Sequence, residues 1–202
     1  MKERPILFNA EMVRAILEGR KTMTRRPVKP QPHTIPWCDA YGNADDALFW
    51  RYGEEKEDWP YPRFCPFGQS GDRLWVRETW AEALGSSFAA PLERYRQGSA
   101  DGYGIGAIYR ATPHPDYRVE TWRPSIHMPR WAARITLEIT NVRVERVQDI
   151  TEGDAMAEGA PWEDCWSSYR QSFEALWCRT YGPQSWSWNL WAWVIEFRRI
   201  EA

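Results

Sequence analysis

The stretch "WAARITLEITNVRVERVQDI", residues 131–150, carries the clearest alternation of apolar and polar residues in this chain. Ile135, Leu137 and Ile139 recur at every second position, and valines continue the pattern from residue 142 after a break. An alternation with a period of two places apolar side chains on one face of a β-strand. The stretch therefore predicts two consecutive strands or one long bent strand.

Shorter segments on both sides of this stretch also predict strands. In "GDRLWVRETW", residues 71–80, Leu74 and Val76 face one way while Trp75 and Arg77 face the other. Further strands are predicted at Arg4–Asn9, Gly106–Ala111 and Asn189–Ile200.

Three helices are expected between these strands. Apolar residues at positions 12, 13, 16 and 17 lie at helical spacing, and Gly19 is expected to end that helix. Thr151 is expected to cap a short helix, with Asp154 three residues further on. A longer helix is predicted near Asp164–Cys178.

Two segments, at about 27–70 and 81–128, predict long irregular insertions. The first is rich in Pro, Gly and acidic residues, and the second contains one short predicted strand. Several short strands with few helices indicate an α+β fold, a closed or partly closed β-barrel with peripheral helices. We expect a single domain over residues 1–202.

Composition excludes several classes of protein. The chain of 202 residues is 43% hydrophobic and carries a net charge of -2. No apolar run reaches the roughly 18 residues that cross a bilayer, and the N-terminal segment has no secretion-signal pattern. We therefore expect a cytoplasmic protein without a membrane partner, and the oligomeric state is left open.

The cysteines and histidines do not predict a metal site. Cys38, Cys65, Cys165 and Cys178 are far apart and form no CxxC motif. A zinc site from His33, Cys38 and Cys65 is conceivable but lacks paired spacing. We expect reduced thiols, no metal and no cofactor.

The charge distribution and the tryptophan content indicate which ligands the chain could bind. Residues 1–30 hold eight Lys/Arg against three Glu, whereas the near-neutral net charge disfavours binding of a long nucleic acid. The chain has fourteen tryptophans, which favour core packing and loop anchoring in general. For Trp75 and Trp80, packing and base stacking are both open.

The segment "GRKTMTRR", residues 19–26, contains a lysine and a threonine that could act together. Residues three apart on a regular strand point to opposite faces, so Lys21 and Thr24 can cooperate only in a turn or loop. A lysine amine could then take the proton of the Thr24 hydroxyl if desolvation and the neighbouring Arg20, Arg25 and Arg26 lower the lysine pKa. The alternative is a solvated basic edge.

These motifs together resemble the ASCH domain, a PUA-like family of bacteria and their phages. The resemblance is carried by "ILEGRKTMTRR", "GDRLWVRETW", "ARITLEITNVRVERVQDITEGDAMAEG" and "VIEFRRI", somewhat under half of the chain. It implies an α+β fold, a PUA-like mixed β-barrel with peripheral helices. This chain is about twice the length of the small enzymes of the family because of its two insertions.

Within the family, the resemblance extends to the bacterial N4-acetylcytidine amidohydrolase. Carried over by motif, its catalytic group would be Lys21 as general base, Thr24 as nucleophile and Glu158 as the acid for the leaving amine. Glu158 lies seven residues after Thr151, which opens the predicted helix. The alternative for Glu158 is an exposed carboxylate at a helix end.

The sequence thus predicts a cleft that binds a nucleoside or another modified base, with RNA as a further partner. Besides the three catalytic candidates, Arg20, Arg26, Trp75, Arg77 and Glu78 are expected to bind the substrate. Hydrolysis of an acyl amide is the leading hypothesis, and two alternatives are open. One is a non-catalytic RNA-recognition or nucleic-acid-recognition module, and the other is an RNA-cleaving enzyme.

Overall fold

The computed structural model divides the chain into two compact units. Unit 1 comprises Met1–Thr22, Phe67–Thr140 and Phe197–Ala202, and unit 2 comprises Met23–Pro66 and Asn141–Glu196. The structure describes residues 1–31, 33–34, 37–38, 44–45, 48–50, 59–60, 65–85, 95–97, 104–113, 119–162 and 166–200. The single-domain organisation expected from the sequence stays a prediction.

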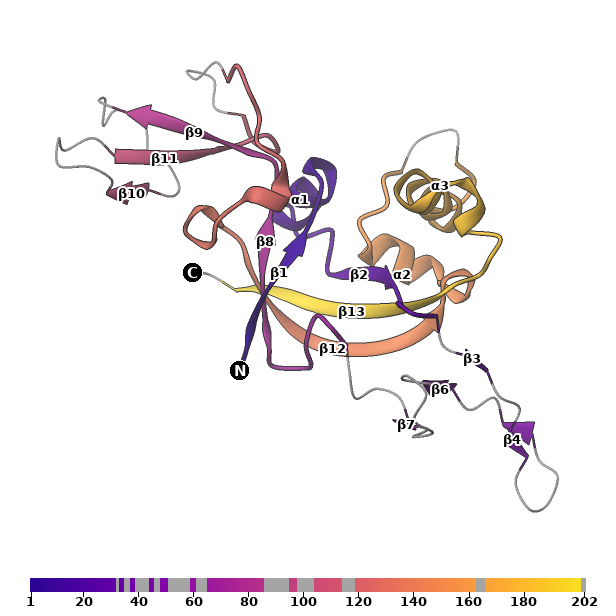
Figure 1. Ribbon diagram of the computed structural model, residues 1–202. Helices are drawn as coiled ribbons and strands as arrows, with labels where there is room; N and C mark the ends of the chain where they lie inside the picture. The colour runs from indigo at the N-terminus through magenta and orange to yellow at the C-terminus, as the bar shows by residue number, and fades with distance from the viewer. Residues whose placement is uncertain are drawn as a thin grey trace. The chain divides into compact units, whose positions relative to one another are not determined.

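The largest sheet has five strands in the order β1-β8-β12-β13-β2 (Figure 1). β1 pairs with β8 in parallel, whereas β8 with β12 and β13 with β2 are antiparallel. A mixed sheet with few helices confirms the predicted α+β class. The strands are β1 (Glu3–Leu7), β2 (Met23–Pro27), β8 (Arg73–Arg77), β12 (Thr136–Arg146) and β13 (Trp191–Ile200).

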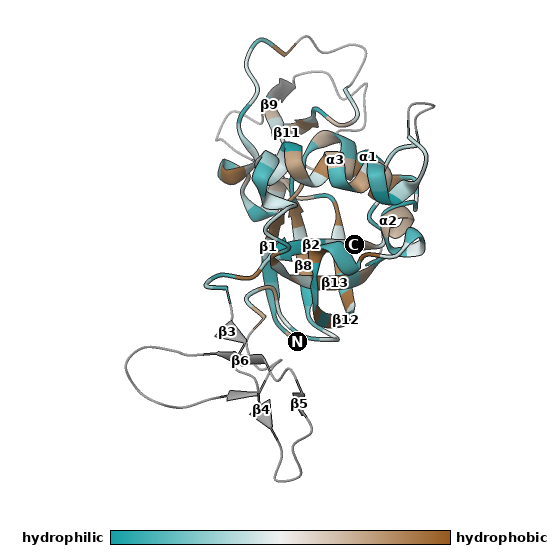
Figure 2. Ribbon diagram, turned by 90° about the vertical axis from the view of Figure 1, so that its right-hand side faces the viewer, coloured by the Kyte–Doolittle hydropathy of each residue, from teal (hydrophilic) through white to brown (hydrophobic). Residues whose placement is uncertain are grey.

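β12 is one continuous strand, which decides between the two possibilities for residues 131–150. Ile135, Leu137 and Ile139 are buried as predicted. Thr140 and Asn141 are exposed and mark the break, and the following residues of the strand are half-buried. Figure 2 shows hydrophobic stretches, in brown, within the strands of the sheet.

Unit 1 begins with β1 and helix α1 (Ala10–Leu17). The Asn9 side chain caps the helix by accepting from the backbone N–H of Met12, and Val13 and Ile16 are buried. Gly19 follows with a φ of +75°, the left-handed conformation that ends a helix, so the predicted stop is confirmed. Unit 1 also contains the 3-10 helices η1 (Ser125–His127) and η2 (Arg130–Ala132).

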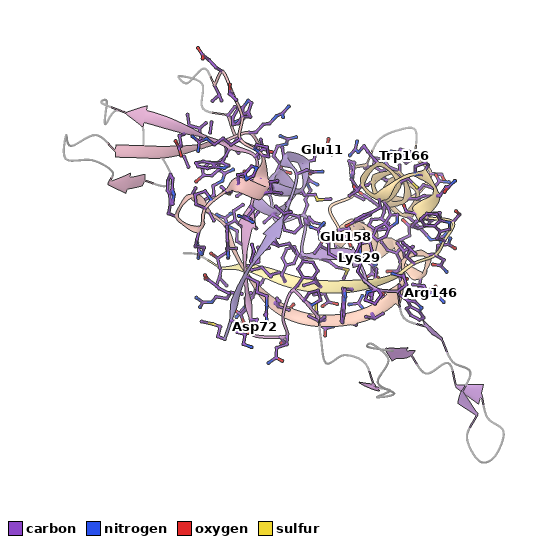
Figure 3. All side chains as sticks on the ribbon, viewed as in Figure 1. Glu11, Lys29, Asp72, Arg146, Glu158 and Trp166 are labelled. Atoms are coloured by element: carbon purple, nitrogen blue, oxygen red, sulfur yellow. The ribbon has the colours of Figure 1, made fainter. Side chains whose placement is uncertain are left out.

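The turn before β8 explains the Gly-Asp pair of "GDRLWVRETW". The Asp72 carboxylate accepts from the backbone N–H of Lys2 at 2.7 Å and from Arg4 Nη1 at 3.2 Å. These bonds tie the first strand to its parallel neighbour, and Figure 3 labels Asp72 at this position. On β8, Leu74 and Val76 are buried while Trp75 and Arg77 are half-buried, as the alternation predicts.

The second insertion contains a three-stranded sheet in the order β10-β11-β9. The predicted strand at Gly106–Ala111 is present as β11, but the expectation of an otherwise irregular segment is wrong. The residues of β9 and β10 have no strand pattern of their own, and they form strands because each segment pairs with β11. The three strands are β9 (Trp80–Gly85), β10 (Tyr95–Gln97) and β11 (Gly104–Tyr109).

The first insertion is also not wholly irregular. Its short strands form a three-stranded sheet in the order β3-β6-β7 and a pair of β4 with β5. The rest of the insertion predicted at about 27–70, which falls between residues 32 and 64, lies outside the described residues. The strands are β3 (His33–Thr34), β4 (Trp37–Cys38), β5 (Ala44–Asp45), β6 (Leu48–Trp50) and β7 (Trp59–Pro60).

Unit 2 places two helices beside its strands. Thr151 caps α2 by accepting from the backbone N–H of Asp154 at 3.1 Å, which confirms the predicted cap. α3 begins after its cap Ser168, later than the predicted start at Asp164, which lies outside the described residues. The helices are α2 (Glu152–Ala157), α3 (Tyr169–Tyr181), η3 (Val147–Asp149) and η4 (Pro183–Ser185).

The core of unit 2 lies between these helices and β13. Ala192, Trp193, Val194 and Ile195 are all buried, so this part of β13 is covered on both faces. Ala192 packs in a cluster with residues of η3, α2 and α3. Within the described part of the chain, no helix has the length and apolar character needed to span a membrane.

Candidate functional site

The segment "GRKTMTRR" leaves α1 through a short loop before it enters β2. The backbone N–H of Lys21 donates to the Ala15 carbonyl at 3.0 Å, and the strand begins only at Met23. Lys21 lies in this loop whereas Thr24 lies on β2, so the two are not on one regular strand, but the four residues also do not form a single turn or loop. Cooperation of Lys21 with Thr24 stays a prediction.

Lys21 is buried in unit 1 and not part of a solvated edge. Its side chain is 2% exposed, and its Nζ lies 5.6 Å from the centre of the Phe8 ring. Phe8 in turn packs against Phe197, with ring centres 6.2 Å apart. Lysine side chains are rarely fully buried, so this burial makes Lys21 a candidate functional residue.

Arg20 behaves differently from its neighbour. It is exposed, and its Nε donates to the Glu18 carboxylate at 2.8 Å. Its charge is therefore compensated at the surface. The role of Arg20 in substrate binding stays a prediction.

In unit 2, Thr24 lies on β2 opposite Ile195 and is 2% exposed. Glu158 follows the last residue of α2 and is 3% exposed; it is labelled in Figure 3. The backbone N–H of Glu158 donates to the Asp154 carbonyl at 2.8 Å, which fixes the helix end. An exposed helix-end carboxylate is therefore the wrong interpretation of Glu158.

The β2 side chain that the structure places beside Glu158 is Arg25. Its Nη1 lies 3.6 Å from Glu158 Oε1, while its Nη2 donates to Glu145 and to Asp154, each at 2.9 Å. The Arg25 side chain has no exposed surface. Because Thr24 and Arg25 are consecutive strand residues, their side chains point to opposite faces of β2.

A second guanidinium extends this network. Arg143 pairs with Glu145, with Glu196 and, at 3.6 Å, with Asp154. Burial alone would lower the pKa of Arg143, but the hydrogen bond and charge of Glu145, with the charges of Glu196 and Asp154, raise it above its ordinary value.

The three arginines that neighbour Lys21 in the sequence differ in their contacts. Arg20 and Arg25 each pair with carboxylates of their own unit. A lowering of the Lys21 pKa by these arginines stays a prediction. Arg26, the third of these arginines, is half-buried and donates to the Tyr181 hydroxyl at 3.3 Å.

Trp75 and Arg77 lie together on one face of β8, as predicted. The Arg77 guanidinium carbon is 5.1 Å from the centre of the Trp75 ring, and that of Arg130 is 5.8 Å away. Arg77 Nε also donates to the Met128 carbonyl at 3.0 Å. Two guanidinium groups over one indole reduce the surface that a base could stack upon.

Glu78 forms a buried ion pair in unit 1. Its two carboxylate oxygens accept from Nε and Nη2 of Arg134 at 2.9 and 3.0 Å. The Arg134 guanidinium lies 3.9 Å from the centre of the Tyr109 ring and donates to the Thr112 hydroxyl. This geometry is that of an internal ion pair, and the predicted contact of Glu78 with substrate stays a prediction.

Trp80 is a core residue and not a stacking platform. It is 1% exposed and packs edge-on against Trp131, with ring centres 5.8 Å apart. The interpretation as packing is therefore confirmed for Trp80.

The predicted site residues are divided between the two units. Lys21, with the predicted substrate contacts Arg20, Trp75, Arg77 and Glu78, belongs to unit 1, whereas Thr24, Arg26 and Glu158 belong to unit 2. Convergence of Lys21, Thr24 and Glu158 stays a prediction.

The sequence analysis missed the residues that hold Glu158. Asp154 lies on α2 and Glu158, four residues later, caps its end, a spacing that places both side chains on one face of the helix. That spacing could have been read from the sequence. The partner on β2 could not, because nothing local pairs residue 25 with residues 154 and 158.

No metal site is apparent among the side chains that the structure describes. Cys178 is a free thiol. The side chains of His33, Cys38 and Cys165 lie outside the described residues, so the structure does not bear on a set made from His33, Cys38 and Cys65.

No family model and no curated protein matches the chain. A protein from Enterococcus faecalis V583, assigned to DUF984, is 10% identical with a TM-score of 0.40, covering 99% of this chain and 80% of that one. An ASCH domain from Lactobacillus crispatus JV V101 is 12% identical with a TM-score of 0.40, covering 98% and 79%. The second structure belongs to the family that the sequence motifs resemble. At these TM-scores neither similarity bears on function.

Proposed function

We propose that this chain is an ASCH-type amidohydrolase that removes an acyl group from an N4-acetylcytidine-like nucleoside. Lys21, Thr24 and Glu158 are its catalytic residues. The observation that carries the proposal is their burial: each is at most 3% exposed. A buried amine, hydroxyl and carboxylate within the motifs that resemble the family indicate chemistry rather than a solvated surface.

The chain itself limits the distance between two of the three residues. Lys21 and Thr24 are three positions apart, so their Cα atoms lie within about 11 Å of each other in any conformation. A lysine side chain is long and flexible, and Lys21 lies in a loop. Contact between its amine and the Thr24 hydroxyl is therefore compatible with the connectivity.

The reaction follows from the chemistry of the three groups. Lys21, as general base, takes the hydroxyl proton while Thr24 Oγ attacks the acetamide carbonyl carbon. The C–N bond breaks, Glu158 protonates the departing cytosine amine, and an acetyl ester remains on Thr24. Water then cleaves this ester, so that the products are cytidine and acetate and the threonine is restored.

The recognition hypothesis has less support. Base stacking on Trp75 would have to displace or share the ring with Arg77 and Arg130. Trp80 has no exposed face to offer. Neither of the two tryptophans singled out in the sequence therefore resembles the open aromatic platforms that single-stranded nucleic acids use.

Incubation of the purified protein with N4-acetylcytidine and, separately, with a short RNA tests the proposal. Mass spectrometry should detect cytidine and acetate from the first and no shortened product from the second. Cleaved RNA would indicate a ribonuclease, and bound but unchanged RNA would indicate a recognition module. Unchanged N4-acetylcytidine at high enzyme concentration would reject the amidohydrolase.

A further inference from the structure

We infer that Arg25 is a positioning residue of the proposed reaction, whose guanidinium holds the Glu158 carboxylate and the end of α2 against β2. The inference rests on the proposed function, in which Glu158 gives a proton to the leaving amine. Arg25 is assigned no contact with substrate.

The carboxylates that pair with Arg25 come from two elements of unit 2 and from the residue after one of them. Glu145 belongs to β12, Asp154 belongs to α2, and Glu158 directly follows α2. The two short hydrogen bonds go to Glu145 and Asp154, and the longer ion pair of 3.6 Å goes to Glu158. Arg25 thus fastens α2 one turn before Glu158 as well as at Glu158 itself.

The surroundings leave Arg25 little freedom. Its guanidinium carbon lies 6.0 Å from the centre of the Phe173 ring on α3, and its Nη1 is 3.2 Å from Met23 Sδ. With no exposed surface, the side chain keeps one orientation. The helix end is fixed from the other side by Gly159, whose φ of +75° terminates α2.

Arg25 shares its carboxylates with a second guanidinium group. Arg25 and Arg143 both pair with Glu145 and Asp154. Arg25 also pairs with Glu158, and Arg143 also pairs with Glu196. The two arginines therefore contact the same residue of α2, and the pair that reaches the Glu158 carboxylate is that of Arg25.

The test compares Arg25→Met and Arg25→Lys with the parent protein on N4-acetylcytidine. Misplacement of a reacting group by about 1 Å can cost about 100-fold in rate. We expect Arg25→Met to lower kcat by about 100-fold with KM within about 2-fold, because substrate contacts are untouched. Arg25→Lys keeps the positive charge but loses the planar guanidinium, so its kcat should lie between those of the parent protein and Arg25→Met.

Arg143→Met is the matched control. Arg143 shares Glu145 and Asp154 with Arg25, but the structure records no ion pair between Arg143 and Glu158 among the described side chains. The control should lose stability and keep kcat within about 2-fold. An equal loss of kcat in both variants would overturn the inference.

A double-mutant cycle separates positioning from general structure. In a Glu158→Gln background, Arg25→Met should cause no further loss of kcat, because the group through which it acts is gone. A full additional loss would show that Arg25 acts elsewhere and would overturn the inference.

Crystal structures of the parent and of Arg25→Lys separate failure of the inference from failure of the proposed function. If the parent protein does not deacetylate N4-acetylcytidine, the proposed function is rejected, and the inference about Arg25 is then decided by the position of the Glu158 carboxylate. We expect this carboxylate to lie about 1 Å or more from its parental position in Arg25→Lys while β2 stays in place. A shift of that size is enough to lose reactive geometry. A carboxylate that does not move would overturn the inference.

Discussion

Buried charged side chains pair in two different ways in this molecule. Glu78 and Arg134 are joined by two hydrogen bonds to one carboxylate, whereas Arg25 pairs with several carboxylates. Removal of one partner from a buried ion pair is costly, because the remaining charge is left in a low-dielectric surrounding. Arg25 still has two of these carboxylates when one of the three is removed.

The pair of Glu78 and Arg134 gives a prediction for stability. Glu78→Gln should lower the free energy of unfolding by about 3–5 kcal/mol, because the Arg134 side chain, 5% exposed, loses the carboxylate that accepts two of its hydrogen bonds. The matched control is Glu82→Gln, which breaks the exposed pair with Arg123 and should cost less than about 1 kcal/mol. Urea unfolding of both variants measures the difference, and equal losses would contradict the prediction.

The proposed base and nucleophile give a prediction for activity. Lys21→Arg should reduce kcat/KM for N4-acetylcytidine by at least about 100-fold, because a guanidinium does not release its proton near neutral pH. Thr24→Ser should keep part of the activity, and Thr24→Ala should remove it. Release of cytidine measures all three.

A Lys21→Arg protein that works at the parental rate would exclude the lysine as a base. Circular dichroism of each variant serves as the control for folding. Loss of activity together with loss of the fold would leave a structural role for Lys21, which is 2% exposed, as the explanation.

The sequence could indicate which residues of the site are chemically special but not their partners. The motif drew attention to Lys21, Thr24 and Glu158, and all three are buried. The Arg25 contacts join residues more than a hundred positions apart. Such pairs depend on how β2, β12 and α2 pack, and no local pattern encodes that packing.

At the scale of elements, the turn before β8 gives a dependence on pH. The backbone N–H of Lys2 is the main cause that lowers the pKa of Asp72 below its ordinary value, with Gln69 and Arg4 adding to it. A lowered folded pKa stabilises the fold above the unfolded value of about 3.9. This contribution is lost as the pH falls below about 4 and through the folded pKa.

Asp72→Asn should therefore be less stable than the parent at neutral pH, and the difference should shrink as the pH falls below about 4. Thermal unfolding across that range measures it. Glu3, whose pKa is lowered by a hydrogen bond from Arg130, is unchanged in both proteins and contributes equally. A difference that stays constant with pH would contradict the assignment.

The same turn contains two glycines that make a matched comparison. A Cβ on Gly68 would lie 2.9 Å from both Arg4 Nη1 and Asp72 Oδ2, whereas one on Gly71 would meet nothing within 4 Å. Both have positive φ, so each change to alanine carries a backbone cost of about 1–2 kcal/mol. Gly68→Ala should therefore lower the melting temperature more than Gly71→Ala does. Equal melting temperatures would show that the space beside Gly68 accepts a Cβ.

Periodicity predicted the strongly patterned elements and missed those defined by pairing. β12 follows directly from its alternation of apolar residues. β9, "WAEALG", is rich in Ala, Glu and Leu, which favour helix by propensity, and it is a strand because it pairs with β11 along its whole length. The start of α3 is decided by the hydroxyl of Ser168, which accepts from Gln171 N–H.

At the scale of the whole molecule, two strands belong to both units. The division falls after Thr140 within β12 and after Glu196 within β13. Neither unit can lose its structure without breaking the regular conformation of these strands. We expect thermal unfolding to be a single transition, with coincident curves from circular dichroism and tryptophan fluorescence. Two separated transitions would show that the units unfold independently.

The edge-on pair of Trp80 and Trp131 in unit 1 gives the protein an intrinsic spectroscopic signal that depends on local packing. Their ring planes are 87° apart, and Trp80 is 1% exposed. Transition dipoles of two such close, rigidly held indoles couple, and their ellipticity depends on the mutual orientation of the rings. Emission from an indole shielded from water is shifted towards the blue. Because the chain has fourteen tryptophans, the difference between the spectra of the parent and a Trp131→Phe variant would isolate this pair and report on the packing around β9 and η2.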